Sequence, residues 1–563
     1  MRTNSFYIFL SYLSLVIMFC YSCNQQNELN KKNATLSGIP HLQKNGNSVQ
    51  LVVDNKPFIM ISGELHNSSS SSVEYLAPLW PKLKAMNLNS VIASVAWEQF
   101  EPEEGVYDFT LVDEIISKAK ENDLKLCLIW FATWKNGRST YTPMWVKKDT
   151  KRFFRVKSKN GKNTEVISPL CENSMKADAK AFGILMNHIK KVDKLNTVIM
   201  MQIENEVGIQ FQDFDYSTGS LKHFEQEVPF QFISYLNKNK NQLTQKLDSV
   251  WRINGYKSKG TWKEVFGNNP YSKEFFLAWH YAFYINEVCK TGKKEHSLPM
   301  YVNAWLEGPN EMPGDYLNGG PVASVIDIYK AAAENIDIIA PDIYRPNFRE
   351  ITGLYHRKDN ALLIPESEHT ASRAFYAFAQ HDAICYSPFG IEDDTLNHAL
   401  IQAYKTLDEL KPLLIKYQGT GKMAGILAEG NEKECTVELG DYTIKAVYKN
   451  SNGQSRAETK EGSFGLIIQT SENEFVVSGM NMWLFFSAKD TTKTGHIAQV
   501  WEGGFDGGKW KSIRMLNGDE TIAHFVVKVM GKPYATKVDN TIYSPDRMIT
   551  TPGIYKVLTY MRD

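Results

Sequence analysis

Acidic side chains stand at the ends of two apolar runs in this sequence. Val198–Met201 leads into Glu204, Asn205 and Glu206, and a later apolar run ends at Glu366. Buried strands do not usually end in charged residues without a reason. Cleavage of a glycosidic bond needs two carboxyl groups, one protonated to donate to the leaving oxygen and one ionised to attack the anomeric carbon. The two runs could supply one group each.

Both candidate acids have an acidic neighbour that leaves an alternative open. Glu368 lies two residues after Glu366 and faces the same way if the strand continues, so it is the alternative nucleophile. Glu204 is expected one step deeper than Glu206, on the same side of the strand. Its negative charge would raise the pKa of Glu206, as a catalytic acid requires, and a structural hydrogen-bonding role is the other interpretation.

Eight apolar runs of strand length recur along most of the chain and must position these acids. They cover residues 58–66, 90–98, 124–132, 197–206, 298–306, 337–344, 361–368 and 383–390. Continuous apolar runs of this kind are typical of strands buried on both faces of a parallel sheet, and helical patterns separate them. The alternation predicts an α/β fold, a (β/α)8 TIM barrel over residues 49–408, with large insertions after the third and fourth strands.

The pattern changes after about residue 410. Short segments of alternating polarity, broken by Gly, Asn and Asp, replace the alternation of strands and helices. This change predicts a second domain over residues 409–563, folded as an all-β sandwich.

The N-terminus has the features of an export signal. Residues 1–23 begin with Met-Arg, continue with a mostly apolar run and end in Ser22 and Cys23. The run suits a signal peptide better than a membrane span. A small residue before Cys23 predicts a lipoprotein lipidated at Cys23, with residues 24–48 as a tether, and plain secretion is the alternative. We expect an exported protein in the periplasm or at the surface of a bacterium, held to the membrane only through a lipid anchor.

Composition excludes several classes of function. Lys+Arg and Asp+Glu both number 63, so the net charge gives no reason to expect a nucleic acid partner. After the signal region no C-x-x-C occurs, and the sequence has no H-E-x-x-H or Gly-rich phosphate motif, so we expect neither a metal nor an organic cofactor. The cysteines after the signal region are widely spaced and odd in number, which does not indicate a disulfide framework: Cys127, Cys171, Cys289, Cys385 and Cys435.

Polar and aromatic residues collect at the predicted carboxyl ends of the strands, where the active site of such a barrel lies. Besides the acids above, these ends carry Glu64, His66, Trp97, Glu98, Trp134, Lys135, Asn136, Asn303, Trp305, Asp342 and Tyr344. Carboxylates and amides bond to hydroxyl groups and aromatic faces cover the apolar face of a sugar, so this set favours a neutral carbohydrate ligand. Trp134 and Trp305 either stack on sugar or pack in the core. Tyr344 could hold the nucleophile by a hydrogen bond.

Several segments resemble glycoside hydrolase family 35, the β-galactosidase family, in order along residues 50–405. SGELHNSS resembles the opening strand of the family, and VAWEQFEPEEGVYDFT resembles its W-x-x-x-E-P-x-x-G-x-Y-D-F block. TPMWV is similar to the end of a Leu-Pro-x-Trp-Leu block, MQIENEVG resembles the Q-x-E-N-E-x-G block, and LLIPESE resembles the nucleophile segment of one branch. The β-rich tail also resembles the C-terminal domain of that branch.

Carried over to this sequence, the resemblance implies roles for the matching residues. Glu206 would be the acid/base, Glu366 would be the nucleophile, and Asn205 would contact the sugar 2-hydroxyl. The residues expected to bind the substrate are Asn205, Glu64, Trp134, Lys135, Asn136, Tyr344 and Trp305. The expected function is a retaining exo-glycoside hydrolase that releases terminal β-galactose by a double displacement.

The sequence departs from the family pattern after the third strand. Many members have Ala-Glu-Trp there, and this chain has Thr133 in place of the sugar-binding Glu. Lys135 or Asn136 is expected to take over part of its role, which leaves the sugar open. The alternatives are the same mechanism on another terminal sugar, such as a β-glucosaminide or an α-L-arabinopyranoside, and a glycan-binding lipoprotein without catalysis.

Overall fold

The structure is a computed structural model that describes residues 38–449, 462–516, 518–533 and 550–563. The predicted signal peptide, the predicted lipidation site Cys23 and most of the predicted tether lie outside these ranges. Across the described residues, no helix is both long enough and apolar enough to span a membrane.

Eight parallel strands surround the centre of the larger part of the molecule. They are β4 (Met60–Ile61), β5 (Ser90–Ala96), β6 (Lys125–Lys135), β9 (Val198–Asn205), β10 (Met300–Trp305), β11 (Ile338–Asp342), β12 (Leu363–Ile364) and β13 (Cys385–Tyr386). They form a run of five and a run of three, all with parallel neighbours. Parallel bridges from Glu64 to Ile92 and from Ile343 to Ser367 join the two runs at both edges, which closes the barrel.

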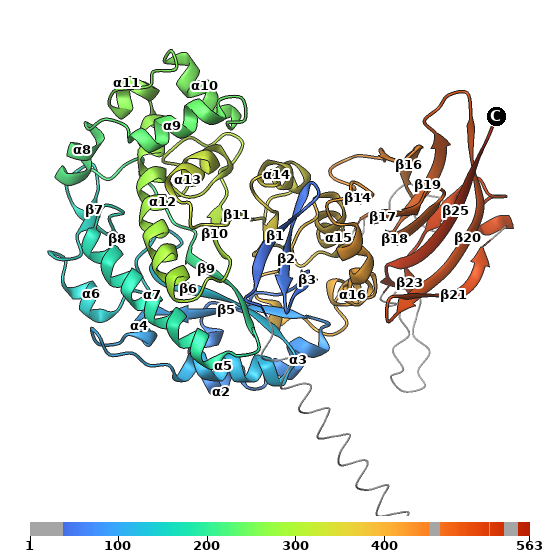
Figure 1. Cartoon of the computed structure of the whole chain (residues 1–563), viewed down its shortest axis with the longest axis horizontal. Coiled ribbons are helices and arrows are strands. Elements are labelled where there is room, and N and C mark those ends of the chain that lie inside the picture. The colour runs from blue at the N-terminus through green and yellow to red at the C-terminus, as the bar shows by residue number, and fades with distance from the viewer. Residues whose placement is uncertain (1–37, 450–461, 517, 534–549) are drawn as a thin grey trace, which may run out of the picture.

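Helices follow every strand of the barrel and surround it (Figure 1). They are α2 (Val73–Leu76), α3 (Leu79–Ala85), α4 (Trp97–Phe100), α5 (Thr110–Glu121), α7 (Glu172–Val192), α12 (Pro270–Glu295), α13 (Ile326–Ala332), α14 (Phe348–Tyr355), α15 (Ala371–Gln380) and α16 (Ala399–Tyr417). The predicted alternation of strands and helices is confirmed. The insertions also occur where they were expected. After β6 come α6 (Met144–Lys148), β7 (Arg155–Lys157) and β8 (Asn163–Ile167), and after β9 come α8 (Thr218–Phe224), α9 (Phe230–Asn239), α10 (Gln245–Ile253) and α11 (Trp262–Phe266).

The strands are apolar on both faces because each face has its own core. In β6, Cys127, Ile129 and Phe131 belong to the core inside the barrel, whereas Leu126 and Leu128 belong to the core between strands and helices. This alternation has the period of two that a strand imposes. It is broken at Thr133, which contacts Asp178 of α7, within the stretch from Trp130 to Lys135 where the pairing of β6 with β9 shifts register.

A small antiparallel sheet packs against the interior core of the barrel and corrects one boundary. Its strands are β1 (His41–Asn45), β2 (Ser48–Val53) and β3 (Lys56–Phe58). Leu51 and Val53 join the interior core together with Met60 of β4. The predicted tether therefore does not extend to residue 48, because residues 41–48 are already folded into this sheet.

The turn of this sheet touches the chain just after α16. Asn47 N donates to Gly419 O (3.1 Å), and Asn45 Nδ2 donates to Gln418 O (2.7 Å). A Cβ atom on Gly419, whose φ is +77°, would lie 2.0 Å from the carbonyl oxygen of Asn45.

Substituting alanine for Gly419 should therefore be costly. We expect Gly419→Ala to lower the free energy of unfolding by about 2–4 kcal/mol, since the left-handed backbone and the overlap both count against it. Gly421→Ala is the matched control, because Gly421 has φ +70° with nothing within 4 Å of the added Cβ, and it should lose only about 1 kcal/mol. Urea unfolding of both variants measures the difference, and equal losses would contradict the close contact.

Two antiparallel sheets make up the β-rich part, at the right of Figure 1. The first has the order β14 (Met423–Leu427), β17 (Phe464–Ser471), β18 (Glu474–Met480), β25 (Gly553–Arg562), β20 (Thr494–Asp506) and β21 (Lys509–Leu516). The second has the order β15 (Glu434–Leu439), β16 (Tyr442–Tyr448), β19 (Met482–Ala488) and β22 (Val527–Val529). A short pair, β23 (Lys532–Pro533) and β24 (Thr550–Thr551), stands apart. Side chains of the two larger sheets share one core, with Ile444 and Leu484 from one and Ile467 and Val477 from the other.

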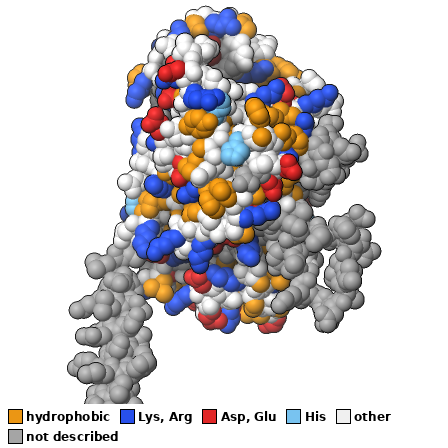
Figure 2. Space-filling model, turned by 90° about the vertical axis from the view of Figure 1, so that its right-hand side faces the viewer, with side chains coloured by type: hydrophobic (Ala, Val, Ile, Leu, Met, Phe, Trp, Pro, Cys, Tyr) orange, Lys and Arg blue, Asp and Glu red, His pale blue; other side chains and the backbone are white. Residues whose placement is uncertain are grey.

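The six-stranded sheet also packs against the helices of the barrel. The rings of Phe375 in α15 and Phe464 in β17 lie 5.2 Å apart, and Leu466 and Ile468 belong to the core between barrel strands and helices. The predicted boundary at residues 408 and 409 falls inside α16, and the β-rich part begins at β14. Figure 2, turned to the β-rich end, shows cationic, acidic and apolar side chains mixed over this face.

Candidate active site

A cavity of about 420 Å³ opens at the carboxyl ends of the barrel strands. Its walls combine acids, cations, amides and aromatic rings. They are Asn67, Lys135, Asn136, Glu206, Trp305, Leu306, Asp342, Tyr344, Arg345, Glu366 and Phe389. The structure thus brings Glu206 and Glu366 together in one cavity, although 160 residues separate them in the sequence.

Glu366 is held in the cavity by donors from three strands or strand ends. Tyr344 Oη donates to its Oε2 (2.9 Å), and Asn205 Nδ2 (3.3 Å) and Asn303 Nδ2 (3.5 Å) donate to its Oε1. Donors aimed at both oxygens fix the direction of the carboxylate. Glu368, the alternative nucleophile, is exposed outside the cavity wall and pairs with Arg373 at 3.4 Å. The geometry favours Glu366 over Glu368.

Glu206 is 5% exposed, and its environment suits a group that carries a proton at neutral pH. Burial, followed by the charge of Glu366, raises its pKa to about 7, although a hydrogen bond with Asp342 and the charge of Lys135 act in the opposite direction. Its backbone N–H donates to Asn303 Oδ1 (2.9 Å), and φ at Glu206 is +44°. The left-handed backbone ends β9 and turns this side chain toward the cavity.

Asn205 links Glu366 to a lysine on the neighbouring strand. Its Oδ1 accepts from Lys135 Nζ (2.9 Å) while its Nδ2 donates to Glu366. The loop after β6 is also tied to β9, since Asn136 N donates to Asn205 O and Gly137 N donates to Glu206 O, both at 3.1 Å. Among the described residues, Asn136 Oδ1 is buried without a hydrogen-bond partner. It is a ready acceptor for a ligand hydroxyl group.

Thr133 does not lie on the cavity wall. Its hydroxyl accepts from or donates to Tyr284 Oη (2.7 Å) and donates to Asp178 Oδ2 (2.9 Å), so the side chain faces the helices α7 and α12. The wall after β6 is made by Lys135 and Asn136 instead.

Trp134 corrects a further prediction. It is 0% exposed, its Nε1 donates to Ile167 O (3.0 Å), and its ring packs against Tyr281 and Tyr284. It packs in the core, so the expectation that it binds substrate is wrong. Trp305, by contrast, is 43% exposed and lines the cavity, where a sugar ring can stack on it.

Glu64 is buried and is not among the residues that line the cavity. Neither of its carboxyl oxygens has a hydrogen-bond partner among the described residues. Burial raises its pKa well above the usual range, the nearby charges of Glu366 and Glu206 raise it further, and Lys135 acts in the opposite direction. A buried carboxyl group that satisfies no protein partner is suited to bonding with a ligand or with water.

The structure also corrects the placement of Glu204. Its φ of +61° turns the side chain away from the barrel interior. On the outer side its carboxylate accepts from the backbone N–H groups of Thr133 (3.1 Å) and Trp134 (2.7 Å). It also shares a hydrogen bond with the buried Asp178 of α7. Glu204 is not among the charges that raise the pKa of Glu206. Of the two interpretations, the structural one fits.

The pair of Glu204 and Asp178 should make stability depend on pH. Burial, together with the charge of its partner, raises the pKa of Glu204 well above the usual range, and burial raises that of Asp178. The folded protein therefore keeps a proton that the unfolded chain releases. Its stability falls by about 1.4 kcal/mol per pH unit from the ordinary carboxyl pKa up to the raised one.

Asp178→Asn replaces this shared proton by an amide hydrogen. We expect the stability of the variant relative to the wild type to improve as the pH rises from 5 to 7, measured by urea unfolding at each pH. Glu165→Gln, at an exposed position, is the control and should run parallel to the wild type. If the stability of Asp178→Asn changes with pH in the same way as that of the wild type, Asp178 and Glu204 share no proton.

Sequence reasoning named the strand-end residues Asn303 and Asp342 without including them in the site. Asn303 contacts the backbone of Glu206 and the side chains of Asp342 and Glu366. The signal was available, since both residues end predicted strands. Asn67, Arg345 and Phe389 were missed because they lie on loops whose course depends on tertiary structure.

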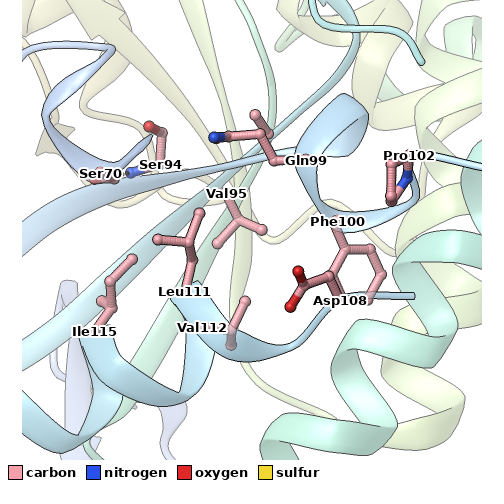
Figure 3. Close-up of a pocket in the computed structure, with 11 residues that line it drawn as sticks. Ser70, Ser94, Val95, Gln99, Phe100, Pro102, Asp108, Leu111, Val112 and Ile115 are labelled. Carbon is pink, nitrogen blue, oxygen red and sulfur yellow. Dashed lines mark hydrogen bonds between the residues drawn. The ribbon is translucent and has the colours of Figure 1, made fainter. Parts of the chain in front are cut away.

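A second cavity, of about 290 Å³, lies beside β5 and α5 (Figure 3). Val95, Leu111, Val112 and Ile115 give it mainly apolar walls. Asp108 is the one acid among the described residues that line it, and its Oδ1 accepts from Thr110 N (2.9 Å). Without a pair of carboxyl groups, this cavity lacks the chemistry found at the barrel mouth.

Within the described ranges, the acids that come closest to one another as a group of three are Glu206, Asp342 and Glu366. One oxygen from each lies within 4.8 Å of the other two. Burial raises the pKa of both Glu206 and Asp342, which favours their neutral forms, so we assign no metal to this group. That the protein needs no cofactor stays a prediction.

Comparison with known proteins bears on the barrel directly. Residues 77–276 match the family model described as beta-galactosidase. This model is that of glycoside hydrolase family 42, whereas the sequence motifs suggested family 35, and the narrower assignment stays a prediction. The match relates the barrel to glycoside hydrolases and includes Glu206, but it ends before Glu366. Residues 400–526 match a domain of unknown function, DUF5597.

Individual β-galactosidases are also similar to this chain. Beta-galactosidase 14 of Arabidopsis thaliana is 25% identical over 210 residues, which are 35% of this chain and 21% of that protein. The chain therefore matches about a fifth of the length of this relative. The crystal structure of beta-galactosidase from Bacillus circulans sp. alkalophilus has a TM-score of 0.43 and 15% identity, over 63% of this chain and 57% of that one. The crystal structure of the cold-adapted beta-galactosidase of Rahnella sp. R3 has a TM-score of 0.42 and 17% identity, over 67% of this chain and 58% of that one.

Proposed function

We propose that this protein is a retaining exo-glycoside hydrolase that releases terminal β-galactose. The observation that carries the proposal is the carboxyl pair in the cavity, since an oxygen of Glu206 and an oxygen of Glu366 lie within 4.8 Å. Retaining enzymes hold their carboxyl groups about 5–5.5 Å apart, whereas inverting enzymes leave about 6.5–9.5 Å for a water molecule. The short separation supports a double displacement.

This mechanism needs a protonated Glu206 and an ionised Glu366. Glu366, directed by Tyr344 and Asn205, attacks the anomeric carbon while Glu206 donates its proton to the leaving oxygen. Esterification removes the charge of Glu366, and with it one of the causes that raise the pKa of Glu206. Glu206 then takes a proton from the water that hydrolyses the glycosyl-enzyme and returns to its starting state.

The choice of galactose rests on the family match, and the residues of the cavity wall are also compatible with a related sugar. Thr133, at the position where many family members carry a Glu, faces the helices, and Lys135 and Asn136 form the cavity wall there. A donor in place of an acceptor changes which hydroxyl groups are recognised. A β-glucosaminide or an α-L-arabinopyranoside is the second candidate substrate.

A panel of nitrophenyl glycosides tests the proposal. Hydrolysis of the β-galactoside, with the β-anomer as the first product seen by proton NMR, is the expected result. Turnover of another glycoside alone would replace the sugar and keep the mechanism. If no glycoside is hydrolysed while sugars still bind, the protein is the glycan-binding alternative.

We further propose that the protein is exported and lipidated at Cys23, on the strength of the apolar run and the Ser-Cys pair at residues 22 and 23. Expression of the full chain in a bacterium, followed by fractionation, tests this. The wild type should be found with membranes, and Cys23→Ala should abolish labelling by a fatty-acid analogue. Equal labelling of both would refute the lipid anchor.

A further inference from the structure

A third carboxyl group, that of Asp342 at the end of β11, lies between the two proposed catalytic acids. It is 3% exposed, and one of its oxygens lies within 4.8 Å of both Glu206 and Glu366. Asn303 Nδ2 donates to its Oδ2 (2.7 Å). Among the described residues no N–H or hydroxyl donor reaches its buried Oδ1. The side chain instead makes a hydrogen bond with the carboxyl group of Glu206.

Two carboxyl groups can share a hydrogen bond only if one of them carries a proton, since ionised carboxylates are acceptors only. The charged or titratable groups that act on Asp342 or line the same cavity are Glu64, Lys135, Glu206, Tyr344, Arg345 and Glu366. Burial, followed by the charges of Glu366 and Glu206, raises the pKa of Asp342 well above its usual range. The proton of the pair therefore belongs on Asp342 when Glu206 is ionised.

Asn303 fixes which way Asp342 can donate. Its Oδ1 accepts from the backbone N–H of Glu206 (2.9 Å), which orients its amide group so that Nδ2 points to Asp342 Oδ2. With Oδ2 occupied as an acceptor, the hydroxyl of a protonated Asp342 is left on the side of Glu206. A single amide thus sets the geometry of both acids.

We propose that Asp342 is a positioning residue that keeps its proton through the reaction and donates a hydrogen bond to Glu206. The inference rests on the proposed hydrolase function. In the first step the bond occupies one oxygen of Glu206, so the proton on its other oxygen is directed to the leaving group. In the second step the same bond stabilises the Glu206 carboxylate until it takes a proton from water. Asp342 gains and loses no proton, and the proton balance is that of Glu206 alone.

Two substitutions separate this role from its rivals, measured on whichever aryl glycoside the wild type hydrolyses. Asp342→Asn retains a donor for Glu206 and an acceptor for Asn303, so kcat/KM should stay within about tenfold of the wild type, with the alkaline limb of its pH profile unmoved. Asp342→Ala removes the donor, and kcat/KM should fall by roughly 10²-fold while the alkaline limb moves to higher pH, because the hydrogen bond favours ionised Glu206. A loss in Asp342→Asn as large as in Asp342→Ala, or an unmoved limb in Asp342→Ala, would overturn the proposal.

Infrared spectroscopy can detect the proton on Asp342 without any measurement of turnover. At neutral pH the wild type should show carbonyl absorption of protonated carboxyl groups, and Asp342→Asn should lose part of it, with circular dichroism confirming that both proteins are folded. Unchanged absorption would refute a protonated Asp342. If the wild type hydrolyses no glycoside, the proposed function fails, and the infrared comparison still decides whether Asp342 holds the proton.

Discussion

Glu366→Ala should lower kcat/KM for an aryl β-galactoside by about 10⁴-fold or more, which corresponds to at least about 5.5 kcal/mol of transition-state stabilisation. The substitution removes the carboxylate that would form the covalent intermediate, and water at the same place is a far weaker nucleophile. Three donors, Tyr344, Asn205 and Asn303, would remain aimed at the empty position. Initial rates on the nitrophenyl glycoside measure the loss.

Glu368→Ala is the matched control, because Glu368 is two residues away, exposed and paired with Arg373. It should keep most of the activity. Azide should rescue Glu366→Ala and give a glycosyl azide of inverted configuration, since the small anion enters from the face left by the carboxylate. Full activity in Glu366→Ala, or an equal loss in Glu368→Ala, would sink the assignment of the nucleophile.

Glu206→Gln should lower kcat/KM by about 10²–10⁴-fold for substrates with poor leaving groups, because the amide can donate a hydrogen bond but cannot transfer a proton. In the wild type, burial raises the pKa of Glu206 to about 7. The required form is the protonated one, so wild-type kcat/KM should be level below pH 7 and fall by about tenfold per pH unit above it. That alkaline limb should vanish in the variant.

The leaving group provides the internal control for this prediction. The dinitrophenolate ion of a dinitrophenyl glycoside leaves without protonation, so the glycosylation step of this substrate should depend little on Glu206. For an unactivated galactoside, kcat/KM should fall by the full amount. Equal losses on both substrates would show that Glu206 acts by binding or folding. An alkaline limb that persists in Glu206→Gln would assign the titrating group elsewhere.

The barrel could be predicted from sequence because its signal is local. Each strand is apolar on both faces, as β5 and β9 show by complete burial along their lengths. Helical patterns separate the runs, and parallel strands bring all their carboxyl ends to one rim. Glu206 and Glu366 could therefore be paired across 160 residues without knowledge of any contact between them.

The details that failed depend on backbone changes that periodicity does not reveal. Glu204 was placed on the side of Glu206 by counting two residues along an extended strand, but left-handed φ values at both residues break that count. In β6, where the pairing with β9 is irregular between Trp130 and Lys135, Thr133 likewise faces the helices, whereas Trp134 keeps the side of Leu126 and Leu128. A left-handed backbone at a residue other than glycine costs about 1–3 kcal/mol and persists only where the surrounding structure holds it.

Other failures come from contacts between distant segments. Residues 41–48 are polar enough to suggest a tether, yet His41–Asn45 pair with β2, and the turn between the two strands touches the chain at Gly419. The role of Asp342 also depends on three strands meeting, since nothing near it in the sequence carries a partner acid.

The contact between the six-stranded sheet and helix α15 has a consequence for anyone who wishes to shorten this protein. Helix α15 follows the strand that carries Glu366, and its outer face is covered by Phe464 and its neighbours. A barrel expressed alone, ending near residue 417, would present that apolar face to water. Aggregation, not a smaller active catalyst, is the expected product, and trimming for engineering should begin in the exposed loops of the β-rich part.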